Sequence, residues 1–309
     1  MNAPLHRRDF LKRGLGSGLI LSALPVSRLA SAIEPLQRPG KPRLLTSLAA
    51  YSFRDFFEDG NTKNAADRRI DLFQFIDYCA DQGCAGTELT SYYFPKNPSP
   101  EFLLKLKHRA FVRGIAISGT AVGNNFALEK GPKRDEQIAM VKTWIDRALI
   151  LGAPHIRVFA GSTNTLPRTT AVRLCVEALE ECCDYAGTKG IFLGLENHGG
   201  IVAEADGVLE IVRAVNSSWF GVNLDTGNFR TDDPYGDLAK CAPYAVNVQL
   251  KSEITPRGGT RQQADFNRLT RILRESNYQG YVALEYEAAE SPWTAVPPLL
   301  EQMRTAFNA

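Results

Sequence analysis

The sequence is poor in the residues from which disulfide frameworks, zinc clusters and phosphate-binding turns are built. Its 309 residues include four histidines and six cysteines, and no two cysteines form a CxxC pair. A chain of this length does not need a disulfide framework, and the six cysteines lie in apolar patterns typical of small core residues. The first predicted strand runs into "AAYSFRDFFEDG", which is not the glycine-rich turn of an open nucleotide-binding sheet.

The chain also lacks an excess of charge of either sign. Lys and Arg number 36, and Asp and Glu number 34. Residues 1–32 hold five of the basic side chains and one acid, so the rest of the chain carries 31 basic and 33 acidic side chains. This balance gives no reason to expect nucleic acid or an acidic lipid surface as a partner.

Residues 1–32 have the pattern of an export signal. "HRRDFLKRG" (6–14) places two arginines before Phe-Leu-Lys, a modestly apolar run follows, and "ASA" (30–32) offers small residues for cleavage. The pattern resembles a twin-arginine signal, from which His6 departs at the first position. The apolar run, about 13 residues, is too short to span a bilayer comfortably. We expect cleavage after Ala32 and translocation of a folded protein to the periplasm by the twin-arginine machinery; a disordered basic tail or a short anchor is the alternative.

Short apolar runs alternate with longer amphipathic stretches along the rest of the chain. This pattern predicts helices such as 68–83, 132–152, 169–190 and 263–280. It also predicts eight strands, at residues 45–53, 85–94, 115–123, 155–161, 191–199, 220–228, 245–253 and 281–287. Eight strand-then-helix units imply parallel strands that close into a barrel. We therefore expect one (β/α)₈ TIM barrel over residues 45–309, preceded by a leader at 33–44.

Oxygen-bearing side chains stand at the ends of the last four predicted strands. Glu196 ends the fifth strand, Asp225 the sixth, Gln249 lies near the end of the seventh, and Glu285 lies in the eighth. The carboxyl ends of barrel strands meet at one rim, where barrel enzymes place their chemistry. Three carboxylates converging there would repel one another, and a divalent cation would remove that penalty. The pattern therefore favours a metal site over scattered structural ion pairs.

The ordered set "GLENHGG", "GVNLDTGN", "VQLKSE" and "YVALEYE" resembles the sugar phosphate isomerase/epimerase superfamily, which has a xylose isomerase-like TIM barrel. In that family a Glu, an Asp, a His and a Glu bind one divalent metal ion. The resemblance implies Glu196, Asp225, Gln249 and Glu285 as the metal ligands here. Gln249 departs from the usual histidine. An all-oxygen set favours Mn²⁺ or Mg²⁺ over Zn²⁺.

The resemblance also implies a reaction. The metal would bind a substrate carbonyl and stabilise an enediolate, while Glu196 and Glu285 take and return protons. The product would be an isomer or epimer of a sugar; with a leaving group beside the carbanion, the enzyme would be a lyase or dehydratase. Lys251, His198 and Asn228 are the candidate substrate-binding residues.

Two other functions are weaker expectations. The superfamily includes endonucleases that cut abasic DNA, but these need a histidine-rich zinc cluster, and their Asp-x-x-His is Asp225-Thr226-Gly227-Asn228 here. The other alternative is a non-catalytic sugar-binding barrel. Glu196 and Glu285 are compatible with that function, but binding alone does not require them. Export favours an unphosphorylated sugar or glycoside, such as a 3-keto-glycoside, as the substrate. The sequence determines neither the substrate nor whether the chain forms a homo-oligomer.

Overall fold

The computed structural model describes residues 33–57, 70–162 and 165–309. The predicted signal peptide at 1–32 lies outside the described residues. These described residues form one compact unit. Among the described helices, none is both long and apolar enough to cross a membrane.

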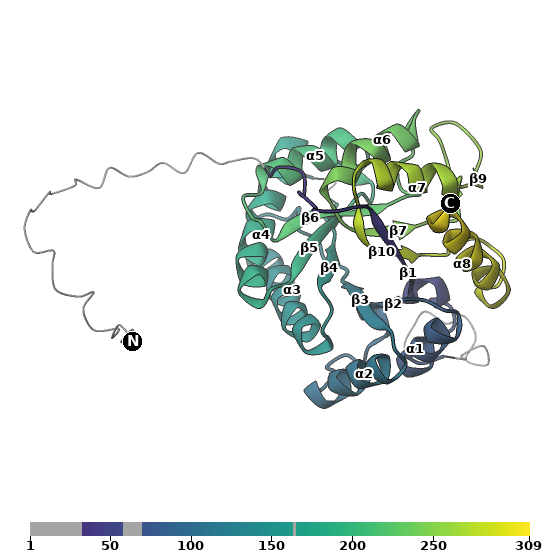
Figure 1. The fold of residues 1–309 in the computed structure, drawn as a ribbon. Helices are drawn as coiled ribbons and strands as arrows, with labels where there is room; N and C mark the ends of the chain where they lie inside the picture. Colours follow the sequence, from purple (N-terminus) through teal and green to yellow (C-terminus); the bar gives the residue numbers. More distant parts are fainter. Residues whose placement is uncertain (1–32, 58–69, 163–164) are drawn as a thin grey trace, which may run out of the picture. The chain divides into compact units, whose positions relative to one another are not determined.

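Eight parallel strands close into a barrel, as the alternation predicted (Figure 1). Around the barrel the order is β1-β10-β7-β6-β5-β4-β3-β2, so each strand lies beside its neighbours in the chain. The strands are β1 Arg43–Ala49, β2 Gly86–Thr90, β3 Ala116–Ala121, β4 His155–Val158, β5 Phe192–Glu196, β6 Phe220–Asp225, β7 Ala245–Leu250 and β10 Gln279–Leu284. Strand β1 begins inside the segment expected to be leader, two residues before the predicted strand.

Helices follow the barrel strands and lie outside them (Figure 1). Asp71 begins the first helix with a capping box to Gln74, and Gly152 and Gly190 end the third and fourth in the left-handed conformation. The helices are α1 Leu72–Asp81, α2 Pro100–Val112, α3 Pro132–Leu151, α4 Arg168–Lys189, α5 Ala205–Ala214, α6 Pro234–Cys241, α7 Phe266–Glu275 and α8 Pro292–Asn308.

A small antiparallel hairpin departs from the predicted alternation. Strands β8 (Glu253–Ile254) and β9 (Gln262–Gln263) pair between β7 and α7. The helix predicted from residue 263 therefore starts only at Phe266, where Asp265 accepts a hydrogen bond from the backbone of Arg268. The hairpin lies at the rim where β7 ends.

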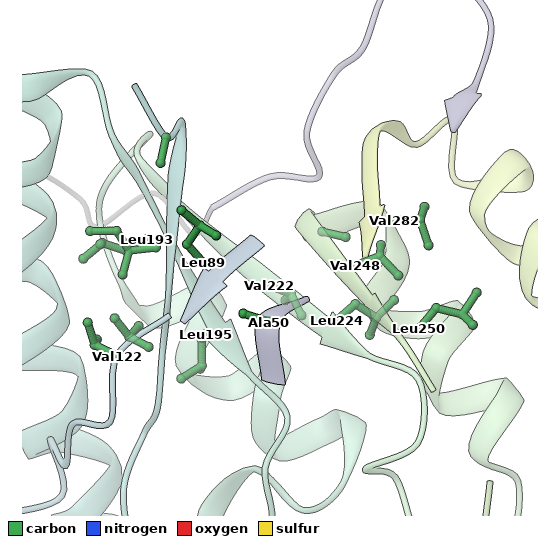
Figure 2. Close-up of a cluster of buried hydrophobic side chains, with 14 of the residues drawn as sticks. Ala50, Leu89, Val122, Leu193, Leu195, Val222, Leu224, Val248, Leu250 and Val282 are labelled. Atoms are coloured by element: carbon green, nitrogen blue, oxygen red, sulfur yellow. The ribbon is translucent and has the colours of Figure 1, made fainter. Parts of the chain in front are cut away.

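The two faces of the barrel strands differ in chemistry. Leu193, Leu195, Val222, Leu224 and other alternate residues belong to the large buried apolar core (Figure 2). Because successive strand residues point to opposite faces, the residues between them face the barrel interior. Interior positions carry mostly polar or very small residues, among them Ser47, Glu88, Ser118, His155, Arg157, Gly194, Asn223, Asn247 and Gln249. The apolar packing thus lies between strands and helices, and the interior is free for polar contacts.

All six cysteines are free and buried, as the apolar patterns predicted. Cys175 and Cys182 both lie on the inner side of α4, where they are fully buried.

The leader covers the other end of the barrel. The Leu36 backbone N–H donates to Pro243 O at 3.1 Å, and the Arg38 guanidinium donates to Ala245 O at 2.5 Å. The same guanidinium lies 5.1 Å from the centre of the Tyr278 ring. Residues 36–38 therefore lie across the floor of the barrel, where they line a hollow with about 830 Å³ of open space together with Ser118 and His155.

Candidate active site

Five predicted site residues lie at the carboxyl-terminal rim. Glu196 and Asp225 are the last residues of β5 and β6, Glu285 follows β10 directly, and Gln249 and Lys251 stand near and just after the end of β7. All five are buried. Parallel strands end on one side of a barrel, which explains why residues so far apart in the chain share this rim.

Glu196 is held by a cation from the neighbouring strand. Arg157 in β4 places Nε 2.9 Å from Glu196 Oε2, and the Asn228 amide donates to Glu196 Oε1 at 3.0 Å. Burial raises the pKa of Glu196, and Arg157 opposes that rise. Arg157 also donates to Val122 O at 2.8 Å, and its guanidinium carbon lies 4.0 Å from the centre of the Phe159 ring. Both ends of this pair are therefore fixed.

Lys251 lies among three carboxylates. Its Nζ is 3.3 Å from Asp225 Oδ2 and 3.2 Å from Glu285 Oε2, and it also contacts Glu287 Oε2. Burial raises the pKa of Asp225, with Lys251 acting against the shift. The pKa of Lys251 is well above its usual value because the carboxylates Asp225, Glu285 and Glu287 outweigh its burial. The lysine is therefore an ammonium ion.

The side-chain amide of Gln249 forms hydrogen bonds inside the barrel. Its Nε2 donates to Glu88 Oε1 at 2.7 Å, and its Oε1 accepts from the Asn223 amide at 2.6 Å. Asn247 completes the ring by donating to Glu88 Oε2 at 2.9 Å and to Asn223 Oδ1 at 2.8 Å. Glu88 belongs to β2, which is separated from β7 by the two strands β10 and β1, so these bonds cross the interior.

His155 also lies beside Glu88. Its Nε2 is 3.9 Å from Glu88 Oε2, and its Nδ1 is 3.1 Å from Ser118 O. Burial lowers the pKa of His155 to about 4 and raises the pKa of Glu88 to about 7. Between these values the two groups are mostly neutral, so their proximity is not an ion pair at mildly acidic pH.

Two hollows open beside these residues. One, with about 440 Å³ of open space, is lined by Lys251, Asn228 and Glu287 together with residues of the β8–β9 hairpin. The other, with about 690 Å³, is lined by His198 and also reaches Asn228. His198 is exposed, and its ring lies 4.7 Å from that of Phe159. All three predicted substrate-binding residues thus line the rim hollows.

The oxygens of the four predicted metal ligands do not converge on one point as arranged, although Asp225 Oδ2 is buried without a hydrogen-bond partner among the described residues. Their oxygens point to different partners: Glu196 to Arg157, Asp225 and Glu285 to Lys251, and Gln249 to Asn223. Hard cations need their oxygen ligands gathered at roughly 2.0–2.6 Å around one point. Within the described ranges, no group of three or more His, Cys, Asp or Glu side chains is placed to hold a metal ion.

The sequence patterns pointed to Gln249 and Glu88 as strand-end residues but did not single out Arg157, Asn223 or Asn247. An arginine within the four-residue buried strand "HIRV" signals a buried carboxylate partner, since a charge is rarely buried unpaired. Alternation along "FGVNLD" and "AVNVQL" likewise places Asn223, Asn247 and Gln249 on one face. The hydrogen bonds that Asn247 and Gln249 donate to Glu88 form only because the barrel closes, which the alternation of one strand does not show.

A sequence profile of the xylose isomerase-like TIM barrel family matches residues 76–306. No functionally curated protein matches the sequence significantly.

Similar solved structures include two epimerases and a dehydratase. D-psicose 3-epimerase from Clostridium cellulolyticum H10, determined with D-tagatose, has a TM-score of 0.67 at 16% identity, with 85% of this chain and 97% of that chain covered. The 3-keto-D-glucoside 4-epimerase of E. coli has a TM-score of 0.62 at 17% identity, with 86% and 100% covered. The probable 3-DHS dehydratase AsbF of Bacillus anthracis has a TM-score of 0.62 at 12% identity, with 86% and 99% covered. At such identities the likeness establishes the fold alone.

Proposed function

This chain belongs to the xylose isomerase-like TIM barrel family, and we propose that it is an isomerase or epimerase of a sugar or glycoside. In the proposed reaction a proton leaves the carbon beside a carbonyl group and returns to the other face or to the neighbouring carbon. The observation that carries the proposal is the pair Glu196 and Glu285, two rim carboxyls separated by β6 and β7, with an ammonium group beside one of them. General acid–base chemistry at a carbonyl needs such a pair and a positive charge.

Glu196 and Glu285 are the proposed proton-transfer groups. One carboxylate takes the proton, the C–H electron pair moves onto the carbonyl oxygen, and the other carboxyl returns a proton to carbon. Arg157 and Asn228 fix the orientation of Glu196 by their contacts with its two oxygens. The Lys251 ammonium, which contacts Glu285, is placed to bind the oxygen on which negative charge develops.

His198 and Asn228 are proposed to bind substrate hydroxyl groups. Asn228 lines both hollows, so a sugar ring spanning them would pass its amide. His198 lines the larger hollow with an exposed imidazole, which can donate and accept hydrogen bonds.

A bound Mn²⁺ or Mg²⁺ remains the expectation from the family resemblance, but its four donors do not converge on one point as arranged. Gln249 would have to leave the interior ring, and Lys251 would have to leave Asp225 and Glu285.

A lyase or dehydratase is the second candidate. The glutamate that takes the proton from carbon can pass it to the leaving group, so this reaction needs no further acid. A dehydratase is also among the proteins with this fold. An enolate formed by the same two glutamates would then expel the leaving group.

Export to the periplasm by the twin-arginine route is proposed on the sequence of residues 1–32 alone. A periplasmic enzyme would meet unphosphorylated sugars and glycosides, which is why these are the proposed substrates. Expression of the full chain with and without the Arg7-Arg8 pair, followed by cell fractionation, tests this part.

Deuterium exchange tests the reaction. The protein is incubated in D₂O with a panel of keto-sugars and 3-keto-glycosides, and NMR follows the C–H beside the carbonyl. We expect exchange with the wild type, strong loss in Glu196→Gln and Glu285→Gln, and no change in the surface control Glu301→Gln. The product separates epimerase from lyase.

Absence of exchange over the whole panel, with substrate binding still detected by calorimetry, would replace the enzyme with a sugar-binding barrel. Full exchange in both glutamine variants would assign proton transfer to other groups.

A further inference from the structure

The hollow at the floor of the barrel lies at the opposite end of the strands from the proposed active site. It holds about 830 Å³ of open space, and its lining residues are distinct from those of the two rim hollows. Residues of β3, β4, β5, β7 and β10 line it together with the leader. The apolar part of its wall consists of Leu36, Pro154, Phe192, Val246 and Tyr281. We call it the floor hollow.

His155 presents a hydrogen-bond acceptor at the wall of the floor hollow. Its side chain is 4% exposed, and its Nδ1 lies 3.1 Å from Ser118 O. A carbonyl oxygen only accepts hydrogen bonds, so Nδ1 carries the proton of the neutral ring and Nε2 has a free lone pair. Among the described residues, Nε2 is a buried atom without a hydrogen-bond partner. A ligand that donates a hydrogen bond would satisfy it.

The backbone of β3 is shaped to hold the His155 ring in this position. A Cβ added to Gly119 would lie 1.9 Å from Cε1 and 2.5 Å from Nδ1 of His155, so only glycine leaves room for the imidazole. The direction of the ring is therefore fixed before any ligand arrives, which lowers the cost of binding.

The leader supplies a cation to the same hollow. The Arg38 guanidinium donates to Ala245 O through Nη2 and lies 5.1 Å from the centre of the Tyr278 ring. Its Nη1 is buried and has no hydrogen-bond partner within the described ranges. A carbonyl oxygen and an aromatic ring leave the positive charge without a counter-ion. A carboxylate is the group that matches a guanidinium in both charge and geometry.

We propose that the floor hollow is a second ligand-binding site, for a small carboxylic acid that carries a hydroxyl group on an apolar ring. The carboxylate accepts a hydrogen bond from Arg38 Nη1, and the hydroxyl donates one to His155 Nε2. The ring packs on the apolar wall, where Phe192 and Tyr281 offer aromatic faces or edges. The site is independent of the reaction proposed at the rim.

Calorimetric titration with the three isomers of hydroxybenzoate tests the pairing, with benzoate and phenol as matched probes. Benzoate lacks the hydroxyl donor, and phenol lacks the carboxylate. We expect one molecule of at least one isomer to bind per chain, and both matched probes to bind about 10-fold more weakly, because each leaves one buried group unpaired. Benzoate binding as tightly as the best isomer would overturn the proposal, and so would no binding of any isomer at millimolar concentration.

Variants locate the site, with circular dichroism as the check on folding. Arg38→Met should weaken binding of the best isomer about 10-fold or more, and Arg38→Lys, which keeps the charge, should retain part of the affinity. Arg43→Met is the matched control, since Arg43 is an exposed arginine at the start of β1. His155→Phe keeps a ring beside Gly119 and should remove the preference for the isomer over benzoate. If His155→Phe does not fold, the Arg38 variants and the wild-type comparison decide.

The rim offers a competing cation for a carboxylate, Lys251. Lys251→Met should leave the affinity for the isomer unchanged. Binding that is lost in Lys251→Met and unchanged in Arg38→Met would place the acid at the rim and overturn the floor site. Because the readout is the heat of binding and not turnover, failure of the proposed function would leave these outcomes as they are.

Discussion

Arg157 and Glu196 form a buried ion pair whose two partners depend on each other. Both side chains are 5% exposed or less, and they come from adjacent strands. A buried ion pair adds little net stability, but removing one partner leaves the other charge unpaired in a low dielectric. The pair therefore fixes geometry more than it stabilises the fold.

Arg157→Met should lower the free energy of unfolding by about 3–5 kcal/mol, because Glu196 is left without its cation. Urea unfolding followed by circular dichroism measures the loss. The double variant Arg157→Met/Glu196→Gln should recover a large part of it. Equal loss in the single and double variants would mean that packing of the arginine, not its charge, is what matters.

Glu88 and His155 influence stability in opposite directions with pH. The folded-state pKa of Glu88, about 7, lies above its ordinary value of 4.5. Its stabilising contribution to the free energy of unfolding is therefore fully present below pH 4.5 and is lost as pH rises through 7. The folded-state pKa of His155, about 4, lies below 6.5, so its contribution is present above pH 6.5 and is lost as pH falls through 4. Between pH 4.5 and 6.5 the two slopes nearly cancel.

Single substitutions should expose these slopes. Relative to the wild type, Glu88→Gln should gain stability with rising pH between 4.5 and 6.5, by up to about 1.4 kcal/mol per pH unit. His155→Gln should lose stability over the same range with a similar slope. Urea unfolding at several pH values measures both differences, and parallel profiles for all three proteins would contradict the assigned pKa directions.

The sequence predicted the rim residues well and their partners poorly. Glu196, Asp225, Gln249, Lys251 and Glu285 do gather at one rim, because strand ends in a parallel barrel must. Which side chain neutralises which carboxylate depends on rotamers and on strands that are not neighbours in the chain. The metal site itself stays a prediction, because its donors do not converge on one point as arranged.

The residues that follow β6 and β7 lie so close together that a Cβ added to Gly227 would overlap the side chain of Lys251. Gly227→Ala should displace the lysine and lower kcat/KM on the substrate found by exchange by about 100-fold, the effect of misplacing a group by about 1 Å. Gly259→Ala is the control, since a Cβ there would meet its nearest neighbour at an ordinary 3.4 Å. Unchanged activity in Gly227→Ala would show that the lysine position is not needed.

Helices with clear stop signals were predicted almost to the residue. The stretches 132–152 and 169–190 correspond to α3 (Pro132–Leu151) and α4 (Arg168–Lys189), each ended by a glycine. Most predicted strands extend too far at their carboxyl ends. The strand-like pattern of apolar and polar residues continues past the last hydrogen bond to the neighbouring strand. The β8–β9 hairpin, with two residues in each strand, is too short for any period to be recognised.

The leader ties the floor of the barrel to its strands by four hydrogen bonds. Besides the bonds of Leu36 and Arg38, Asn277 donates to Arg38 O at 2.6 Å and Gln279 donates to Pro39 O at 2.7 Å. A chain that begins at Lys41 should therefore be less stable than one that begins at Ile33, by about 2–6 kcal/mol at 0.5–1.5 kcal/mol per bond. Thermal unfolding of the two chains measures this, and equal melting temperatures would show that the floor segment adds nothing.

The six buried thiols affect how long the protein would last outside the cytoplasm. Burial raises the pKa of each, to about 12 for Cys84, Cys175, Cys182 and Cys241, so the folded chain presents almost no thiolate to an oxidant. Once unfolded, all six would become reactive and could pair wrongly. In an oxidising compartment each complete unfolding event would then be a one-way loss, so the working lifetime would follow the unfolding rate and not the equilibrium stability.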